Sequence, residues 1–282
     1  MTRLPTMFGA LAIATAMAIG ALAPTQHAFA EEATLSKKAV EKMIDARIKE
    51  SREATLDADT IGPIVKEYLL ANPELLEEVL AALEAKRERD QQVARTEALD
   101  KNREEIFRSS HSAVAGNPAG DITLVEFFDY NCGYCKRMLP ALVDLMDSDP
   151  KLRVVFKEWP VLSEGSAEAA RIAQGVKKVA PERYLDFHVE LMSQPSGSDG
   201  INRKRALEVV DQLELDREAI LAASKESSVD DALEQNFQLA EALGLRGTPS
   251  YVVGNEVIPG ALSFDALQAK IEEARKSGCE TC

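Results

Sequence analysis

The chain begins with an uncharged apolar run, residues 8–23, that follows a single cation at Arg3. An A-x-A pattern of small residues ends at Ala30. A positive start, an apolar run and such a pattern are typical of a signal peptide that is removed after export. We therefore expect residues 1–30 to be a signal peptide, cleaved after about Ala30, of a periplasmic protein. An N-terminal membrane anchor is the alternative, but the run is short for a span of about 20 residues.

Residues 31–110 carry short apolar stripes at helical spacing between highly charged stretches. Apolar positions recur every three or four residues over 61–69 and again over 75–83, and Asn72-Pro73 marks a break between two helices. The stripes are too narrow to bury much surface alone. One interpretation is an oligomerisation stalk in which 75–83 packs against copies of itself. The other is a helical arm that lies on its own catalytic domain.

From residue 112 the pattern changes to strands that alternate with helices. The β-branched and aromatic run 122–129 predicts a buried strand. A helical pattern over 136–146 and a second strand over 152–159 follow. This order predicts the start of a βαβ unit. No later stretch of the chain is apolar enough to predict a membrane span.

The rest of the chain completes an α/β domain that we assign to residues 111–276. Residues 166–243 are almost all helical in pattern and form a long insertion. Two short strands, 250–253 and 256–259, are joined by a Gly-Asn turn typical of a hairpin. A final helix begins at the cap residue Ser263.

The net charge of the chain limits the kinds of molecule that it could bind. The formal net charge is -14, and loss of residues 1–30 removes one cation and no acid, which leaves 32 Lys and Arg against 47 Asp and Glu. Such acidity argues against nucleic acid and against anionic lipid as partners.

The four cysteines form two C-x-x-C pairs, Cys132 with Cys135 and Cys279 with Cys282. A helix begins at the first pair, and the unpaired N–H groups and dipole of a helix start stabilise a thiolate. Cys132 is therefore the predicted nucleophile, and Cys135, one turn later, the predicted resolving thiol of a redox-active disulfide. A zinc site shared by the two pairs is the alternative. The second pair lies in a tail, residues 277–282, that could form its own disulfide, relay electrons or bind copper.

The run from Phe127 to Lys136 resembles the DsbA-like branch of the thioredoxin superfamily, and Gly247-Thr248-Pro249 resembles the cis-proline loop of that branch. The resemblance covers about residues 112–276. It implies a thioredoxin-like fold with an inserted helical domain, and it requires no cofactor or metal.

The resemblance also implies roles for single residues. Pro249 would be cis and would face Cys132, so that the backbone of Thr248 pairs with an extended substrate. Gly133 and Tyr134, between the cysteines, would complete the substrate-binding set.

Glu126 occupies the strand position at which DsbA-like proteins carry a buried acid. A buried carboxyl with a raised pKa could relay the proton of Cys135. The alternative is that Glu126 points to solvent on an alternating strand, but Val125 and Phe127 should share the opposite face.

The segment 63–74 resembles the N-terminal region of the ScsC (suppressor of copper sensitivity) and Com1-type families, which implies trimerisation through the arm. The Gly133-Tyr134 dipeptide resembles that of DsbC-type isomerases. Together they favour a disulfide isomerase or reductase that acts on secreted cysteine-containing proteins and needs a thiol-reductase or oxidase partner in the membrane. A DsbA-type dithiol oxidase and a copper-binding protein that uses the C-x-x-C thiolates are the alternatives.

Overall fold

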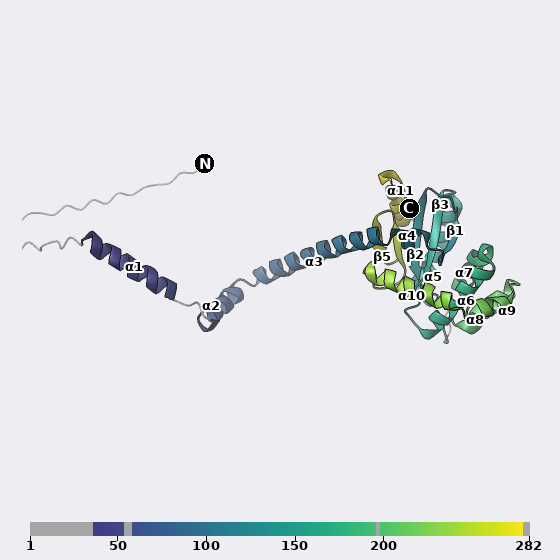
Figure 1. Ribbon diagram of the computed structural model, residues 1–282, viewed down its shortest axis with the longest axis horizontal. Coiled ribbons are helices and arrows are strands. Elements are labelled where there is room, and N and C mark those ends of the chain that lie inside the picture. The colour runs from purple at the N-terminus through teal and green to yellow at the C-terminus, as the bar shows by residue number, and fades with distance from the viewer. Residues whose placement is uncertain (1–35, 54–57, 196–197, 279–282) are drawn as a thin grey trace, which may run out of the picture. The chain divides into compact units, whose positions relative to one another are not determined.

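The computed structural model describes residues 36–53, 58–195 and 198–278 (Figure 1). The predicted signal peptide and the cysteine pair Cys279 and Cys282 lie outside these described residues. The chain divides into two units, residues 1–73 and residues 74–282.

Two helices make up the described part of the first unit: α1 (Lys37–Glu53) and α2 (Ala58–Ala71). Both carry large apolar side chains that are exposed, among them Met43, Ile64 and Leu70, and Leu70 is 73% exposed. Neither helix has a buried side chain among its described residues. Packing of an apolar face supplies most of the stability of a helix in a protein, but the described residues of these two helices leave their large apolar side chains exposed.

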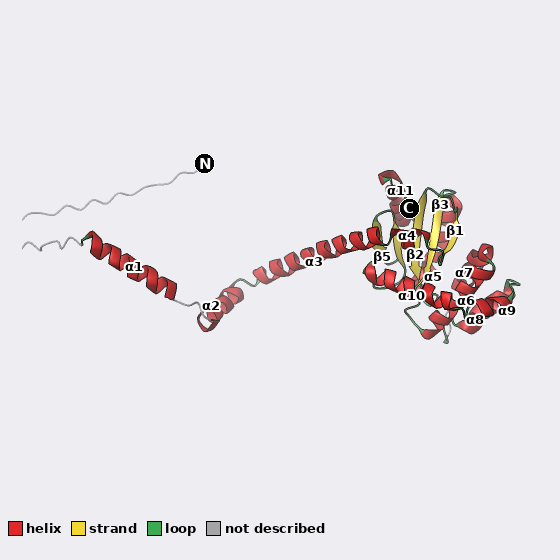
Figure 2. Cartoon of the chain, viewed as in Figure 1, coloured by secondary structure: helices red, strands yellow, loops and turns green. Residues whose placement is uncertain are grey.

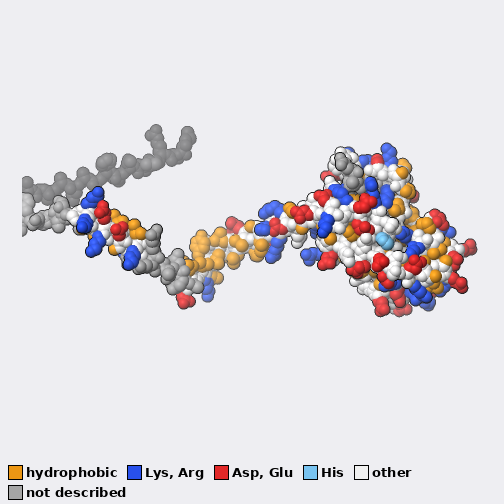
Figure 3. All heavy atoms as spheres, viewed as in Figure 1, with side chains coloured by type: hydrophobic (Ala, Val, Ile, Leu, Met, Phe, Trp, Pro, Cys, Tyr) orange, Lys and Arg blue, Asp and Glu red, His pale blue; other side chains and the backbone are white. Residues whose placement is uncertain are grey.

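The second unit begins with the long helix α3 (Glu74–Lys101) and the short helix α4 (Arg103–Arg108). Figure 3 shows hydrophobic side chains along the first half of α3, and the exposed set there is Leu76, Val79, Leu80 and Leu83. Near its end α3 buries Leu99, and α4 buries Ile106 and Phe107. These three side chains pack in one hydrophobic cluster with side chains of the central sheet.

The domain boundary therefore differs from the expected one near residue 110. The division between the two units falls between Pro73 and Glu74, and the end of the charged segment belongs to the core of the second unit. The reason is that few apolar residues anchor this segment, namely Ala98, Leu99, Ile106 and Phe107. They are too few to form a visible periodic stripe among so many charges.

A five-stranded mixed sheet forms the centre of the second unit, as Figure 2 shows in yellow. The strand order is β1-β3-β2-β4-β5, with β2 and β3 parallel and the other neighbours antiparallel. The strands are β1 (Ala113–Gly116), β2 (Ile122–Phe128), β3 (Leu152–Glu158), β4 (Ser250–Val253) and β5 (Glu256–Pro259). All strands except the edge strand β1 follow the predicted runs.

Helices cover both faces of the sheet. They are α5 (Gly133–Ser148), α6 (Glu164–Val179), α7 (Tyr184–Ser193), α8 (Arg203–Gln212), α9 (Arg217–Ala223), α10 (Ser227–Ala242) and α11 (Phe264–Ser277), with a short 3-10 turn η1 (Pro181–Arg183) before α7. Helices α6 to α10 occupy the predicted insertion. No helix among the described residues is long and apolar enough to cross a membrane.

Alternation along β2 assigns each side chain to one of two cores. Leu124 and Phe128 lie in the larger cluster, which also contains Cys132 and Cys135. Val125 and Phe127 lie in the smaller cluster with the side chains of α4 and the end of α10. Because successive side chains of a strand point to opposite faces, Glu126 lies on the face that carries the cysteines.

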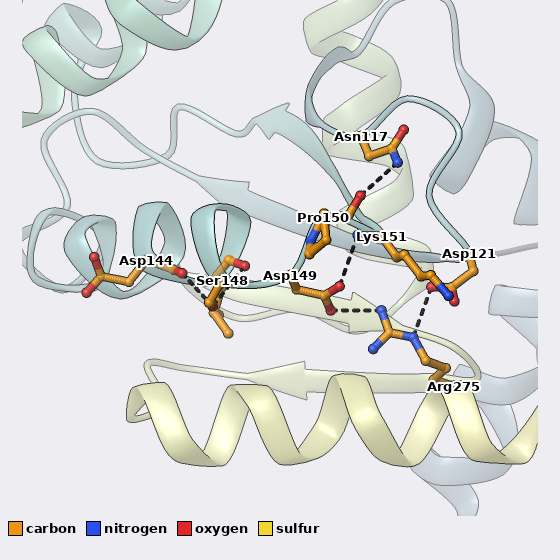
Figure 4. Close-up of polar contacts among 9 residues, drawn as sticks. Asn117, Asp121, Asp144, Ser148, Asp149, Pro150, Lys151 and Arg275 are labelled. Carbon is orange, nitrogen blue, oxygen red and sulfur yellow. Dashed lines mark hydrogen bonds and ion pairs between the residues drawn. The ribbon is translucent and has the colours of Figure 1, made fainter.

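The last helix, α11, is held beside the sheet by Arg275 (Figure 4). The Arg275 guanidinium donates to Asp121 Oδ1 at 2.9 Å and to Asp149 Oδ2 at 2.8 Å. Asp121 precedes β2 and Asp149 follows α5, so one side chain joins two turns to the end of α11.

The packing of α4 gives a stability prediction. Phe107→Ala should lower the free energy of unfolding by about 3–5 kcal/mol, because it removes a fully buried ring from the sheet-facing cluster. Val93→Ala, at an exposed position of the preceding helix α3, should change it by less than about 0.5 kcal/mol. Urea unfolding of the two variants measures the difference, and equal values would mean that α4 does not belong to the domain core.

Candidate active site

Cys132 is the N-cap residue of α5, directly after the central strand β2. Its Sγ accepts a hydrogen bond from the Cys135 N–H at 3.4 Å, and lies 3.1 Å from the backbone oxygen of Thr248. The first N–H groups of a helix have no intrahelical partner, so they are free to face this sulfur. Cys132 and Cys135 are both free thiols and both buried.

The surroundings lower the pKa of the Cys132 thiol and raise that of the Cys135 thiol. A side-chain hydrogen bond with Cys135 is the largest effect on the pKa of Cys132, and it lowers that pKa to about 5. Burial opposes this effect, while a hydrogen bond with the Thr248 side chain and the backbone N–H groups of Cys135 and Tyr134 lower the pKa further. Burial, followed by the hydrogen bond with Cys132 and the charge of Glu126, raises the pKa of Cys135. At neutral pH Cys132 is therefore a thiolate and Cys135 a thiol.

The cis-proline loop lies against the nucleophile, as the sequence led us to expect. The peptide bond between Thr248 and Pro249 is cis, and Pro249 directly precedes β4. Beside this loop is an open, mostly apolar cavity of about 360 Å³. It is lined by Tyr134, Arg246, Gly247, Thr248, Pro259, Gly260 and Ala261.

Gly133 and Tyr134 both lie at the surface next to Cys132. Tyr134 is 60% exposed, and the Arg137 guanidinium stacks on its ring, 4.1 Å from the ring centroid. A cation on an aromatic face is attracted by the ring. The stacking fixes one wall of the cavity beside the nucleophile.

Glu126 is buried behind the cysteines and does not point to solvent. Burial raises the pKa of Glu126 from 4.5 to about 8. The Tyr251 hydroxyl donates to Oε1 at 3.4 Å and opposes this rise, whereas the charge of Cys132 adds to it. Glu126 is close enough to Cys135 for the charge of its ionised form to raise the pKa of that thiol. Only the ionised form of the carboxyl can accept a proton.

Two residues for which the sequence predicted no role, Tyr251 and Asp129, also belong to the site. Tyr251 on β4 contacts Glu126. Asp129 accepts hydrogen bonds from the N–H of Asn131 at 2.7 Å and of Leu162 at 2.9 Å. The first of these is an Asx-type turn, so the Asp-Tyr-Asn order is a local signal that could have identified it.

Among the residues that the structure describes, no group of three or more His, Cys, Asp or Glu side chains is placed to hold a metal ion.

Family models match the two parts of the chain separately. Residues 123–272 match the DSBA-like thioredoxin domain. The chain belongs to the DsbA-like thioredoxin family. Residues 57–89 match the copper resistance protein ScsC N-terminal domain. The chain is thus a DsbA-like oxidoreductase of the ScsC type.

Solved structures of DsbA-like proteins resemble this one. A thioredoxin-like oxidoreductase from Silicibacter pomeroyi is 39% identical, with 62% of this chain and 98% of that one covered and a TM-score of 0.58. Proteus mirabilis ScsC in a transitional conformation is 29% identical, covering 79% and 99%, with a TM-score of 0.58. BcfH of Salmonella enterica Typhimurium is 29% identical, covering 83% and 99%, with a TM-score of 0.66.

Curated relatives match over the same domain. Disulfide bond formation protein D of Bacillus subtilis is 24% identical over 173 residues, which is 58% of this chain and 77% of that protein. The Na(+)/H(+) antiporter NhaA 3 of Salinispora tropica is 23% identical over 162 residues, or 57% of this chain. The chain spans only about a quarter of the length of that antiporter, 24%.

The raised pKa of Glu126 gives a pH-dependent prediction. Because the folded chain binds this proton more tightly than the unfolded chain, the resulting stability is fully present below pH 4.5 and is lost as the pH rises through about 8. Glu126→Gln should therefore match the parent in stability near pH 4 and exceed it near pH 8. Urea unfolding of the reduced protein at both pH values measures this, and a difference that does not change with pH would contradict it.

Proposed function

We propose that this protein is a periplasmic disulfide isomerase or reductase that acts on secreted cysteine-containing proteins. The observation that carries the proposal is the Cys132 sulfur at the start of α5, where its pKa is about 5, beside the cis-proline loop and an open apolar cavity. A stabilised thiolate next to a surface that can receive an unfolded segment is what attack on a substrate disulfide requires.

The reaction begins when the Cys132 thiolate attacks one sulfur of a substrate disulfide. A mixed disulfide forms, and the other substrate sulfur leaves as a thiolate. In isomerisation that thiolate attacks a different substrate disulfide, and a substrate thiolate finally displaces Cys132. In reduction the ionised form of the Glu126 carboxyl accepts the proton of Cys135, and the Cys135 thiolate attacks the Cys132 sulfur. This releases the reduced substrate and leaves a Cys132–Cys135 disulfide.

The loop residues orient the substrate in this scheme. An extended segment pairs with the backbone of Thr248 in front of Pro249. Its apolar side chains enter the cavity, where the Tyr134 ring forms one wall and Gly133 leaves the approach to the sulfur open.

The helical arm favours isomerisation over simple oxidation. Its match to the ScsC N-terminal domain and the exposed apolar face of α3 support assembly of several chains, with a trimer as the proposed state. Several catalytic domains on one assembly raise the effective concentration of nucleophiles around one substrate. An isomerase must remain reduced, so a thiol reductase in the membrane is the proposed partner.

The periplasmic location rests on the expected signal peptide and on a structural neighbour. A periplasmic thioredoxin-like protein of Salmonella enterica serovar Typhimurium is 29% identical to this chain, with a TM-score of 0.53.

A dithiol oxidase is the second candidate, and the low pKa of Cys132 favours it. Stabilising the thiolate stabilises the reduced form, and a stable reduced form makes the disulfide a stronger oxidant. The membrane partner would then be a thiol oxidase.

The arm and the nucleophile can be tested together by refolding a protein with scrambled disulfides. Cys132→Ser should abolish the activity. Leu80→Glu, in the exposed face of α3, should give a monomer in sedimentation and lower isomerase activity about tenfold or more, because multivalency is lost. Val93→Glu adds the same charge at an exposed position outside the ScsC-type segment and should leave both the assembly and the activity as in the parent.

Two results would contradict the proposal. Activity that survives Cys132→Ser would exclude the mixed-disulfide mechanism. A monomeric Leu80→Glu variant with full isomerase activity would mean that the arm does not contribute to isomerisation. A monomer that instead gains dithiol-oxidase activity would show that the arm selects the reaction.

A further inference from the structure

The side chain directly before the nucleophile, Asn131, is bound to the helical insertion. Its Oδ1 accepts the N–H of Ile201 at 2.6 Å, and its Nδ2 donates to the backbone oxygen of the same residue at 2.8 Å. Nδ2 also lies 2.9 Å from Ser166 Oγ and 3.2 Å from Ser163 Oγ. One amide thus pairs with both backbone groups of a residue 70 positions away.

The same segment is attached to the backbone of the catalytic turn. The Asn131 N–H donates to Asp129 Oδ1 at 2.7 Å, and the Cys132 N–H donates to the Asp129 backbone oxygen at 3.0 Å. Asp129 Oδ2 accepts the N–H of Leu162, just before α6. The position of the Cys132 Cα is therefore coupled to the insertion through a short series of hydrogen bonds.

The residues of the insertion that contact Asn131 are closely packed. Gly200 has a φ of +64°, and a Cβ added there would lie 2.7 Å from Asn131 Oδ1. Ile201 is fully buried, and the Ser163 hydroxyl also caps the start of α6. The partners of Asn131 are fixed parts of the insertion.

We propose that Asn131 is a positioning residue, which latches the helical insertion to the catalytic turn and so holds the Cys132 sulfur over the first N–H groups of α5. The Asn131 latch is the set of contacts from its amide to Ile201, Ser163 and Ser166. This inference rests on the proposed function, because it concerns the same thiolate.

The physical effect of the latch follows from geometry. The sulfur is only 3.4 Å from the Cys135 nitrogen, and the stabilisation that a helix start gives to a charge decreases within the first turn. Without the latch the turn before α5 is free to shift, the sulfur spends less time over these N–H groups, and the thiolate loses stability.

The test is the pH dependence of Cys132 alkylation by iodoacetamide in the full chain, followed by mass spectrometry of the peptide that carries Cys132. Asn131→Ala removes the latch from the catalytic side. Gly200→Ala disturbs it from the insertion side without changing the catalytic turn. Each should move the titration midpoint of Cys132 upward by about one pH unit relative to the parent.

Gly244→Ala is the matched control. Gly244 has the same φ of +64°, but an added Cβ would meet only the Arg95 side chain, at 3.8 Å. This variant carries the same backbone strain without touching Asn131, so its midpoint should equal that of the parent. The double variant Asn131→Ala/Gly200→Ala should shift the midpoint no further than either single change, because both act through one contact.

The outcomes separate this inference from the proposed function. Lower thermal stability with an unchanged Cys132 midpoint in both variants would make the role of Asn131 merely structural and overturn the inference. An equal shift in Gly244→Ala would also overturn it. A parent midpoint near that of an ordinary thiol, about 8.5, would overturn the stabilised thiolate itself and the latch with it.

Discussion

The hydrogen bonding of a helix start is the constraint on which the rest of this active site depends. The first backbone N–H groups of α5 have no partner within the helix, and Cys132 is the cap residue that faces them. Stabilisation of negative charge there gives the chain a thiolate at neutral pH. The central strand β2 and the loop before β4 serve this arrangement, because they bring the buried acid Glu126 and the cis-proline loop to the same sulfur.

Local sequence patterns predicted the parts of the structure that depend on neighbouring residues. The run before Cys132 predicted β2, and the helix α5 begins at Cys132 and Cys135 as expected. The strand alternation put Glu126 on the face opposite Val125 and Phe127, and both faces of β2 are buried. The edge strand β1 was not predicted. Its four residues are alanine, valine, alanine and glycine, and such a short run of mostly small side chains shows no detectable alternation. β1 becomes a strand because it pairs with β3 in the folded domain, a contact that its own sequence pattern does not indicate.

The remaining contacts could not be read from the sequence because they join residues far apart in the chain. Tyr251 meets Glu126 only when β4 pairs with β2, and Asn131 meets Ile201 only when the insertion folds over the catalytic turn. Such hydrogen bonds depend on tertiary geometry and leave no periodic signal. They are also the contacts that turn two separate segments of the domain into one site.

In the proposed mechanism Cys132 alone attacks substrate disulfides, and Cys135 resolves the mixed disulfide. The decisive experiment traps that mixed disulfide: the full chain with Cys135→Ala is mixed with a disulfide-bonded peptide, and the products are located by mass spectrometry. We expect a long-lived one-to-one adduct on Cys132, which the parent releases through Cys135. An adduct that forms equally fast when Cys132 is also replaced by serine, or that forms on Cys279 or Cys282 in place of Cys132, would contradict this mechanism.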